Sequence, residues 1–317
     1  MIQRRILCAC VAATPLLSGL HAPAQPLIPQ LEGEWWRIAS QPDLGVLTGE
    51  RQEPVDFGVW RATDGTWQLW SCIRGTKESG TGRLFYGWEG MELTAGDWAP
   101  RGIQMRANVA LDEVEGGLQA PYVKVIDGRH HMFYGTWKAI ALALSEDGRF
   151  FQRQISRDGA VGLFGEPHAH NARDAMVVRH KDLYYCYYTV HPDRIGRILC
   201  RTSPDLKTWS EAHLVRIGGA AGDKLWSHEC PHVVELDGAF YLFTTQNYRG
   251  SPRTTVYRSA NPLNFGLHDD STIVASLPVA APELILHEGQ WYVAALTPEL
   301  DGIRVARLSW QPAKKQP

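Results

Sequence analysis

Three acidic residues lie at the same distance from a recurring turn signal. Each stands eight residues before a signal that begins with Asp and introduces an aromatic-rich segment. The acids are Asp56, Asp174 and Glu229, and their signals begin at Asp64, Asp182 and Asp237. Two further copies of the pattern carry Gln119 and Ala280 at this place. Since those copies have no acid, the repeat itself does not require one, and the three acids are candidates for chemistry.

Carboxylates that share a partly buried site repel one another and raise one another's pKa, so a function is expected to justify the cost. Cleavage of a glycosidic bond needs one carboxylic acid to protonate the leaving oxygen. It also needs one carboxylate that attacks the sugar or activates water. A third acid can tune the first. The alternative interpretation is structural, with each acid capping the start of a strand by accepting hydrogen bonds from backbone amides.

The turn signals are separated by 63, 55, 55 and 51 residues, a period that suits four short strands and their connections. Small sheets with two apolar faces are covered best by neighbouring sheets of the same kind. We therefore predict an all-β fold, a five-bladed β-propeller with four-stranded antiparallel blades, over residues 55–311. A β-sandwich is the alternative, but it would not explain one turn offset found five times. In a propeller, equivalent positions on the innermost strands converge at one end of the central channel.

Three short motifs resemble those of the five-bladed propeller glycosidases, the superfamily that includes glycoside hydrolase families 43, 62, 32 and 68. Arg173-Asp174 is similar to the Arg-Asp-Pro motif of the fructan-cleaving families, and Glu229-Cys230-Pro231 is similar to their Glu-Cys-Pro motif. The stretch from Gln119 to Val123 resembles the Trp-Ala-Pro-Asp-Val stretch of family 43. The resemblance covers roughly residues 50–310.

The resemblance implies a role for each acid. Asp56 would be the general base of an inverting enzyme or the nucleophile of a retaining one, Asp174 would stabilise the transition state or tune the acid, and Glu229 would be the general acid. The chain departs from the family where Phe57 and Ala175 replace the usual prolines, and where the second repeat lacks the customary Trp and Asp. These departures weaken any transfer of substrate by analogy.

Polar and aromatic residues near the inner-strand starts are candidates for contacting sugar. They are Phe57, Gln119, Tyr122, Trp137, His170, Asn171, Arg173 and His228. Arg173 could bind substrate or hold Asp174 ionised. The alternative for each aromatic residue is packing in the core. The alternative for each histidine is a structural hydrogen bond to the backbone. For His232 we expect the structural role, and Trp226, His168 and Glu283 are further, weaker candidates.

No metal site is predicted, because the histidines near the acids lack a dedicated ligand spacing. No cofactor is required, although a structural calcium ion, known in some relatives of the resembled families, could lie in the channel. Cys186 and Cys200 flank a turn symmetrically and could form a cross-strand disulfide or remain two buried free thiols.

The ends of the chain indicate export. Residues 1–24 have two arginines, an apolar stretch and Ala22-Pro23-Ala24, which is typical of a secretory signal. We expect a secreted or periplasmic protein without a membrane span, a lead-in at residues 25–54 and a disordered tail at residues 312–317. The net charge of −2 gives no indication of a nucleic-acid partner. The sequence does not predict an oligomeric state.

These observations predict an exported glycoside hydrolase that acts on poly- or oligosaccharides, with a terminal furanose such as arabinofuranose as one candidate substrate. Two alternatives remain open at this point. One is a carbohydrate-binding propeller without catalysis. The other is a hydrolase or transglycosylase of an anhydro or otherwise unusual sugar, in which a histidine assists.

Overall fold

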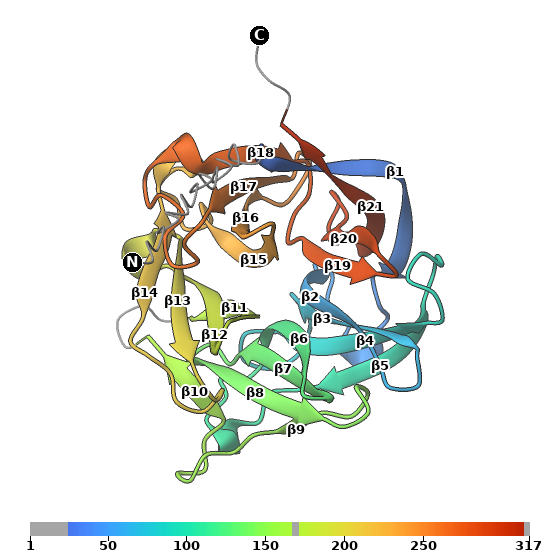
Figure 1. Ribbon diagram of the computed structural model, residues 1–317. Coiled ribbons are helices and arrows are strands. Elements are labelled where there is room, and N and C mark those ends of the chain that lie inside the picture. The colour runs from blue at the N-terminus through green and yellow to red at the C-terminus, as the bar shows by residue number, and fades with distance from the viewer. Residues whose placement is uncertain (1–24, 167–170, 314–317) are drawn as a thin grey trace, which may run out of the picture.

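The computed structural model describes residues 25–166 and 171–313, and these form five antiparallel sheets arranged in a ring (Figure 1). Blade 1 consists of β2 (Glu53–Arg61), β3 (Trp67–Arg74), β4 (Leu84–Gly90) and β5 (Ala99–Met105). Blade 2 consists of β6 (Gln119–Ile126), β7 (Arg129–Gly135), β8 (Ala139–Ser145), β9 (Gln152–Arg153) and β10 (Gly162–Gly165). Blade 3 consists of β11 (Arg173–His180), β12 (Leu183–Val190), β13 (Arg197–Ser203) and β14 (His213–Ile217). Blade 4 consists of β15 (Glu229–Leu236), β16 (Ala239–Asn247), β17 (Arg253–Ser259) and β18 (Ile273–Leu277). Blade 5 consists of β19 (Glu283–His287), β20 (Gln290–Leu296), β21 (Gly302–Pro312) and β1 (Leu27–Ser40).

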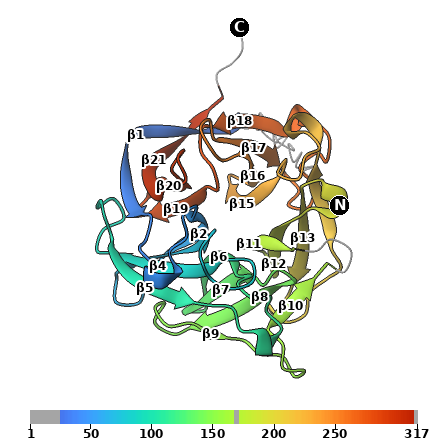
Figure 2. The ribbon, with the colours of Figure 1, turned by 180° about the vertical axis from the view of Figure 1, so that it is seen from behind.

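The predicted five-bladed propeller is confirmed. The innermost strands β2, β6, β11, β15 and β19 surround the central channel in both views (Figures 1 and 2). Four blades have four strands each, and in blade 2 the short strands β9 and β10 both pair with β8. The helical elements among the described residues are short 3-10 turns, at Gly45–Leu47, Val109–Leu111, Pro192–Arg194, Gly219–Ala221 and Asp270–Thr272.

The segment at residues 25–54 is part of the propeller and not a separate lead-in. Strand β1 pairs with β21 from Leu27↔Pro312 to Ser40↔Gly302, so the first strand of the chain completes the last blade. This pairing also takes the propeller to Pro312, where the tail was expected to begin. Ala313 donates a backbone hydrogen bond to the carbonyl oxygen of Pro26 (2.9 Å), and residues 314–317 lie outside the described residues. The predicted signal at residues 1–24 lies outside them as well.

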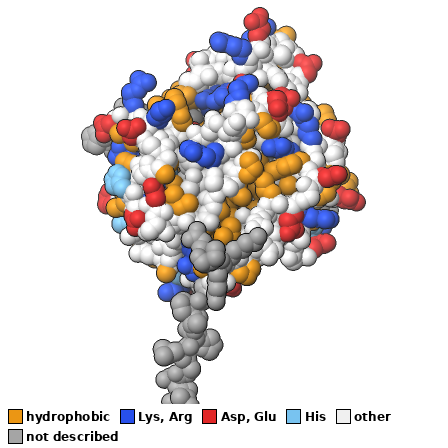
Figure 3. Space-filling model, turned by 90° about the horizontal axis from the view of Figure 1, so that it is seen from above, with side chains coloured by type: hydrophobic (Ala, Val, Ile, Leu, Met, Phe, Trp, Pro, Cys, Tyr) orange, Lys and Arg blue, Asp and Glu red, His pale blue; other side chains and the backbone are white. Residues whose placement is uncertain are grey.

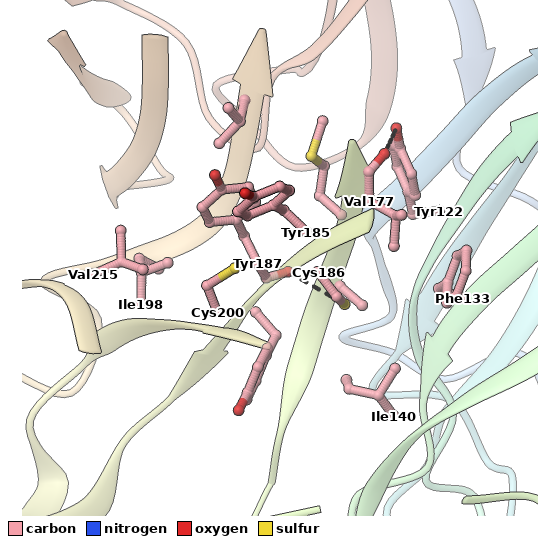
Figure 4. Packing of buried hydrophobic residues seen from close by; sticks show 14 of the residues in the cluster. Tyr122, Phe133, Ile140, Val177, Tyr185, Cys186, Tyr187, Ile198, Cys200 and Val215 are labelled. Carbon is pink, nitrogen blue, oxygen red and sulfur yellow. Dashed lines mark hydrogen bonds between the residues drawn. The ribbon is translucent and has the colours of Figure 1, made fainter. Parts of the chain in front are cut away.

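The aromatic second strands of the blades contribute to the packing between them. In β12, the residues from Tyr184 to Val190 are all buried, because both faces of the blade are covered by neighbours. The core between blades 2, 3 and 4 includes Phe133, Tyr187 and Val215, and the Tyr122 hydroxyl donates a hydrogen bond across it to the carbonyl oxygen of Val177 (3.3 Å; Figure 4). This packing fixes the inner strands on which the acids lie.

Cys186 and Cys200 belong to this core and are free thiols (Figure 4). In the β12–β13 ladder Cys186 lies opposite Arg201, whereas Cys200 lies opposite Tyr187. The two cysteines are therefore one position out of register. Of the two alternatives that the sequence left open, the buried free thiols are confirmed.

Each inner strand carries a residue with positive φ close to its start, either within the strand or shortly before it. These residues are Asp56 (36°), Ala120 (46°), Asp174 (57°), Cys230 (47°) and Ala281 (48°). In the first four blades the ladder shifts register at this place, as a β-bulge does. Asp56 and Asp174 are thus equivalent, while Glu229 occupies the preceding position, together with Gln119 and Arg173.

The prediction that all three acids share one position was therefore wrong by one residue. The third turn consists of Lys181-Asp182, with Lys181 at a φ of 54°, and β12 already begins at Leu183. The first turn is longer than the others, since Arg61 pairs with Trp67 across a loop of residues 62–66. The conclusion that the acids converge does not depend on this offset.

The surface seen from above carries acidic and basic side chains intermixed around a stretch of hydrophobic side chains (Figure 3). This face therefore has no broad patch of a single sign of charge. Over the described ranges 25–166 and 171–313, no helix is long and apolar enough to cross a membrane.

Candidate active site

The three predicted acids line one pocket at the channel. It has an empty volume of about 800 Å³, part of which is open to solvent, within the usual range of small-molecule sites. Its lining residues are Val55, Asp56, Arg74, Arg83, Gln119, Asn171, Arg173, Asp174, His191, Leu225, Trp226, Glu229 and Tyr248. They come from blades 1 to 4 and from the loops that follow their strands. We call this space the acid pocket.

The positive-φ bulges explain how the acids reach the pocket. A bulge inserts one extra residue and turns the side chains at that place away from the regular pleat. Positive φ is strained for residues other than glycine, so packing must impose it. Asp56 and Asp174 hold this conformation, whereas Glu229 lies immediately before the bulge at Cys230. The backbone thus directs carboxylates from three blades towards the same channel.

Cys230 connects the two aspartates. Its backbone N–H donates a hydrogen bond to Asp174 Oδ2 (3.1 Å), and its thiol donates one to Asp56 Oδ1 (3.3 Å). Burial, together with the charges of Asp174 and Asp56, raises the pKa of the Cys230 thiol well above its ordinary value. The thiol is therefore protonated and can act as a donor. The Tyr248 hydroxyl lies 3.2 Å from the same sulfur and completes a chain from Tyr248 through Cys230 to Asp56.

Arg173 connects the other two acids. Its guanidinium contacts Glu229 Oε1, and its Nε lies 3.8 Å from Asp174 Oδ2. Burial alone would lower the pKa of Arg173, but the charges of Glu229 and Asp174 raise it above its ordinary value. One buried cation thus offsets part of the repulsion among three carboxylates. Arg173 also donates to the carbonyl oxygen of Asn171 (3.2 Å), which fixes its orientation.

Asp174 is the most deeply buried of the acids, with 4% of its side chain exposed. Burial raises the pKa of its carboxyl; Arg173 opposes this effect, and the nearby charge of Asp56 adds to it. Its Oδ1 has no hydrogen-bond partner among the residues that the structure describes. Asp174 therefore holds a proton more readily than an ordinary aspartate, which suits a group that tunes its neighbours.

Several predicted contact residues are brought to the acid pocket. Gln119, Asn171 and Arg173 line it, as does the weaker candidate Trp226, which is 51% exposed. The side-chain oxygens of Gln119 and Asn171 are buried and accept no hydrogen bond from the described part of the chain. Such amide groups are suited to binding sugar hydroxyls.

Other predicted residues lie elsewhere. Phe57 and Tyr122 are buried and line a smaller cavity, which Asp56 and Asp174 also line. Trp137 does not line the acid pocket, although its ring packs against the guanidinium of Arg83, which does (5.0 Å from carbon to ring centroid). His168 and His170 lie outside the described residues.

The structure does not bring His228 to the acid pocket. Its side chain is fully buried, with Nε2 3.0 Å from the carbonyl oxygen of Gly218 and Nδ1 3.3 Å from Thr244 Oγ1. The carbonyl can only accept, so Nε2 carries the proton. Burial lowers the pKa of His228 to about 4, which keeps the ring neutral. A histidine directly before Glu229 is therefore part of the blade core.

His232 has the structural role expected for it. It is buried, lies 3.5 Å from Glu283, and its Nε2 accepts a hydrogen bond from the Leu284 amide (3.4 Å). Glu283 lines the smaller cavity and not the acid pocket. Neither residue is placed to act on a substrate beside Glu229.

Sequence reasoning missed six lining residues: Val55, Arg74, Arg83, His191, Leu225 and Tyr248. Val55 directly precedes Asp56, Arg74 and Arg83 lie at the end of the β3–β4 ladder, and the other three lie in loops. Apart from Val55, none of them adjoins one of the acids in sequence. Cys230 was visible within the Glu-Cys-Pro motif, but its sequence does not reveal that the thiol faces Asp56.

The described channel offers few ligands for a calcium ion, which takes about six to eight oxygens. Ligand atoms of Asp56, Asp174 and Cys230 lie within 4.8 Å of one another, and the thiol is a poor ligand for calcium. Around them the smaller cavity is lined mainly by apolar side chains, with Glu283 as its third acid. These side chains alone do not complete a calcium site, and we derive no step through a metal.

Comparison with known proteins places the fold. No protein-family model and no curated protein matches the sequence. Among solved structures, a thermostable family-43 glycoside hydrolase is similar with a TM-score of 0.61 and 17% identity, over 84% of this chain and 92% of the other. An exo-1,5-alpha-L-arabinanase from a bovine ruminal metagenomic library has a TM-score of 0.54 and 17% identity, over 81% and 92%. Sucrose-6-phosphate hydrolase from Lactobacillus gasseri has a TM-score of 0.62 and 14% identity, over 88% of this chain and 62% of that longer one. The chain thus has the five-bladed propeller fold found in these glycoside hydrolases.

Proposed function

We propose that the protein is a secreted or periplasmic glycoside hydrolase that cleaves poly- or oligosaccharides in the acid pocket. The observation that carries the proposal is the convergence of Asp56, Asp174 and Glu229 on one half-open pocket with amide groups ready to bind hydroxyls. Purely structural caps would have no reason to face a common space. Hydrolysis of a glycosidic bond uses two carboxyl groups in different protonation states, and this pocket supplies the means to separate them.

In this mechanism Glu229 donates a proton to the leaving oxygen, and Asp56 attacks the sugar or activates a water molecule. The Cys230 thiol and Asp174 do not react. The thiol orients the Asp56 carboxylate through its hydrogen bond, and Asp174 is held by the Cys230 amide at the centre of the site. Arg173 positions Glu229 and Asp174 relative to each other.

The substrate class is a proposal that rests on similarity of fold. The similar structures include a beta-xylosidase and alpha-arabinofuranosidase of family 43 as well as the arabinanase. A terminal pentofuranose such as arabinofuranose is therefore a reasonable first substrate to test. The low identity of 13% to 17% leaves the sugar itself to experiment.

The deciding experiment compares Glu229→Gln with the wild type on glycosides with good and poor leaving groups. General acid catalysis contributes about 10²- to 10⁴-fold, so Glu229→Gln should lose that factor on poor leaving groups and much less on nitrophenyl groups, which need little protonation. Glu32→Gln, on the exposed face of β1, is the matched control. Equal activity of wild type and Glu229→Gln on poor leaving groups would remove Glu229 from the acid role. Sugar binding without any hydrolysis would favour the carbohydrate-binding alternative.

A further inference from the structure

Two arginines line the acid pocket at its blade 1 side. Arg74 is the last residue of β3, and Arg83 directly precedes β4, next to the last pair of the ladder, Ile73↔Leu84. Two guanidinium groups at one side of a pocket suggest a negatively charged ligand.

Arg83 has no carboxylate partner in the described part of the chain, although it is half-buried. Its guanidinium packs on the ring of Trp137 at 5.0 Å, and its Nη1 lies 3.8 Å from the sulfur of Cys72. The ring and the sulfur hold the side chain but do not neutralise it, and charges withdrawn from water are normally paired.

The surrounding charges do not neutralise this side of the pocket either. Arg74 donates to Glu53 at 2.6 and 2.9 Å, but the same carboxylate also receives Arg249. Glu53 thus pairs with two guanidinium groups, whereas Arg83 pairs with no carboxylate of the described residues. The acids Asp56, Asp174 and Glu229 are partly offset by Arg173, which contacts two of them.

We propose that the sugar unit bound in the acid pocket carries an anionic group that binds between Arg74 and Arg83. The guanidinium fork of Arg83, which has no carboxylate partner among the described residues, matches the oxygens of a carboxylate, a sulfate ester or a phosphate ester. Arg74 can add a second contact through Nη1, because its Nε and Nη2 donate to Glu53. The neighbouring amides of Gln119 and Asn171 then bind sugar hydroxyls. This inference rests on the proposed hydrolase and names uronic acids and sulfated or phosphorylated sugars as its substrate class, in place of the neutral pentofuranose that similarity of fold suggests.

Binding of monosaccharides to the full chain, measured by saturation-transfer NMR, tests the inference independently of catalysis. The probes are D-glucuronate, D-galacturonate, D-galactose 6-sulfate and D-galactose 6-phosphate, with neutral D-glucose and D-galactose for comparison. At least one anionic sugar should bind about 10-fold more tightly than its neutral counterpart, and added salt should weaken that preference. The anionic sugar that binds best identifies the source of the charge.

Three variants assign the preference to Arg83. Arg83→Met keeps the length of the side chain and should weaken the binding of the preferred anionic sugar about 10- to 100-fold, and by less for neutral sugars. Arg83→Lys should retain part of the preference, because it keeps the charge without the fork. Arg101→Met, at an exposed position of blade 1, is the matched control and should bind as the wild type does. Melting curves establish that each variant is folded.

The inference fails if neutral sugars bind wild type as tightly as anionic ones, if no anionic sugar binds, or if Arg83→Met weakens both kinds by the same factor. Each of these results leaves the proposed hydrolase standing if Glu229-dependent hydrolysis is observed. Conversely, selective anion binding that depends on Arg83, without hydrolysis of any glycoside, would overturn the hydrolase and retain the anion site.

Discussion

Cys230 has an unusual environment for a free thiol. It occupies the blade 4 position that corresponds to Asp174 in blade 3, and its sulfur lies between the Asp56 carboxylate and the Tyr248 hydroxyl. Because its pKa is raised by burial, the thiol is a hydrogen-bond donor and a poor nucleophile. Its expected contribution is to orient the Asp56 carboxylate through this hydrogen bond.

Replacing Cys230 by alanine should therefore lower kcat/KM about 3- to 10-fold, the loss expected for one hydrogen bond. Steady-state kinetics would measure this loss. Cys186→Ala, which removes a buried thiol of blade 3, should lower stability without lowering kcat/KM. An unchanged kcat/KM for Cys230→Ala would show that the thiol only fills space.

Asp174 should reduce stability at neutral pH. A carboxyl whose pKa is raised on folding binds its proton more tightly in the folded chain than in the unfolded chain. Its contribution therefore favours folding at a pH below its pKa in the unfolded chain, and this contribution is lost as the pH rises through its pKa in the folded chain. Asp174→Asn should therefore increase the free energy of unfolding at neutral pH while abolishing activity. The advantage should shrink as the pH falls towards 3.8, the ordinary value for an aspartate. Urea denaturation across this range measures the difference.

Asp205 gives a control of opposite sign. The Thr208 and Lys207 backbone amides donate to its carboxylate and lower its pKa. Its contribution to stability is therefore present at a pH above its pKa in the unfolded chain, and it is lost as the pH falls through its pKa in the folded chain. Asp205→Asn should reduce stability at neutral pH and have less effect in acid. If Asp174→Asn also destabilised the protein at neutral pH, the interactions of the Asp174 carboxylate with its neighbours would outweigh the cost of its burial.

At the scale of strands, sequence reasoning succeeded where the pattern is local. The aromatic second strands and the turns before them recur visibly, and they predict both the blades and their number. The bulges at Asp56, Asp174 and Cys230 could not be found in this way, because positive φ is imposed by packing between blades and has no residue signature of its own. Arg83 was missed for a similar reason, since only the folding of the chain brings it to the acid pocket.

Close approach of inner strands positions the acids. A Cβ added at Gly58, two residues after Asp56, would lie 2.6 Å from the carbonyl oxygen of Pro121 in β6. We therefore expect Gly58→Ala to push blade 1 from blade 2, to cost about 1–3 kcal/mol and to lower activity by displacing Asp56. Gly96→Ala is the matched control, because its Cβ would meet only the Arg37 carbonyl oxygen at 3.6 Å. Chemical denaturation of both variants gives the comparison, and equal stabilities would show that the backbone yields without cost.

At the scale of the molecule, the ring depends on its two ends meeting. Strand β1 is separated from its partner β21 by almost the entire sequence, so no local pattern could assign it to blade 5. It also reaches blade 1, where the Trp98 amide donates to the carbonyl oxygen of Ile38 (2.9 Å). The same strand therefore completes one blade and holds the next one against it.

The stability of the whole ring should accordingly respond to one side chain of β1. Ile38 is fully buried in a core that residues of blades 1 and 5 share, so Ile38→Ala should cost about 2–5 kcal/mol and lower Tm by roughly 5–15 °C. Val46→Ala, at a position that is 89% exposed, should leave Tm nearly unchanged. Calorimetry should show a single transition for both, because a ring that loses its closure loses support for every blade. If blade 5 melted separately in Ile38→Ala, closure would stabilise only that blade, and the acids of blades 1, 3 and 4 would keep their geometry without it.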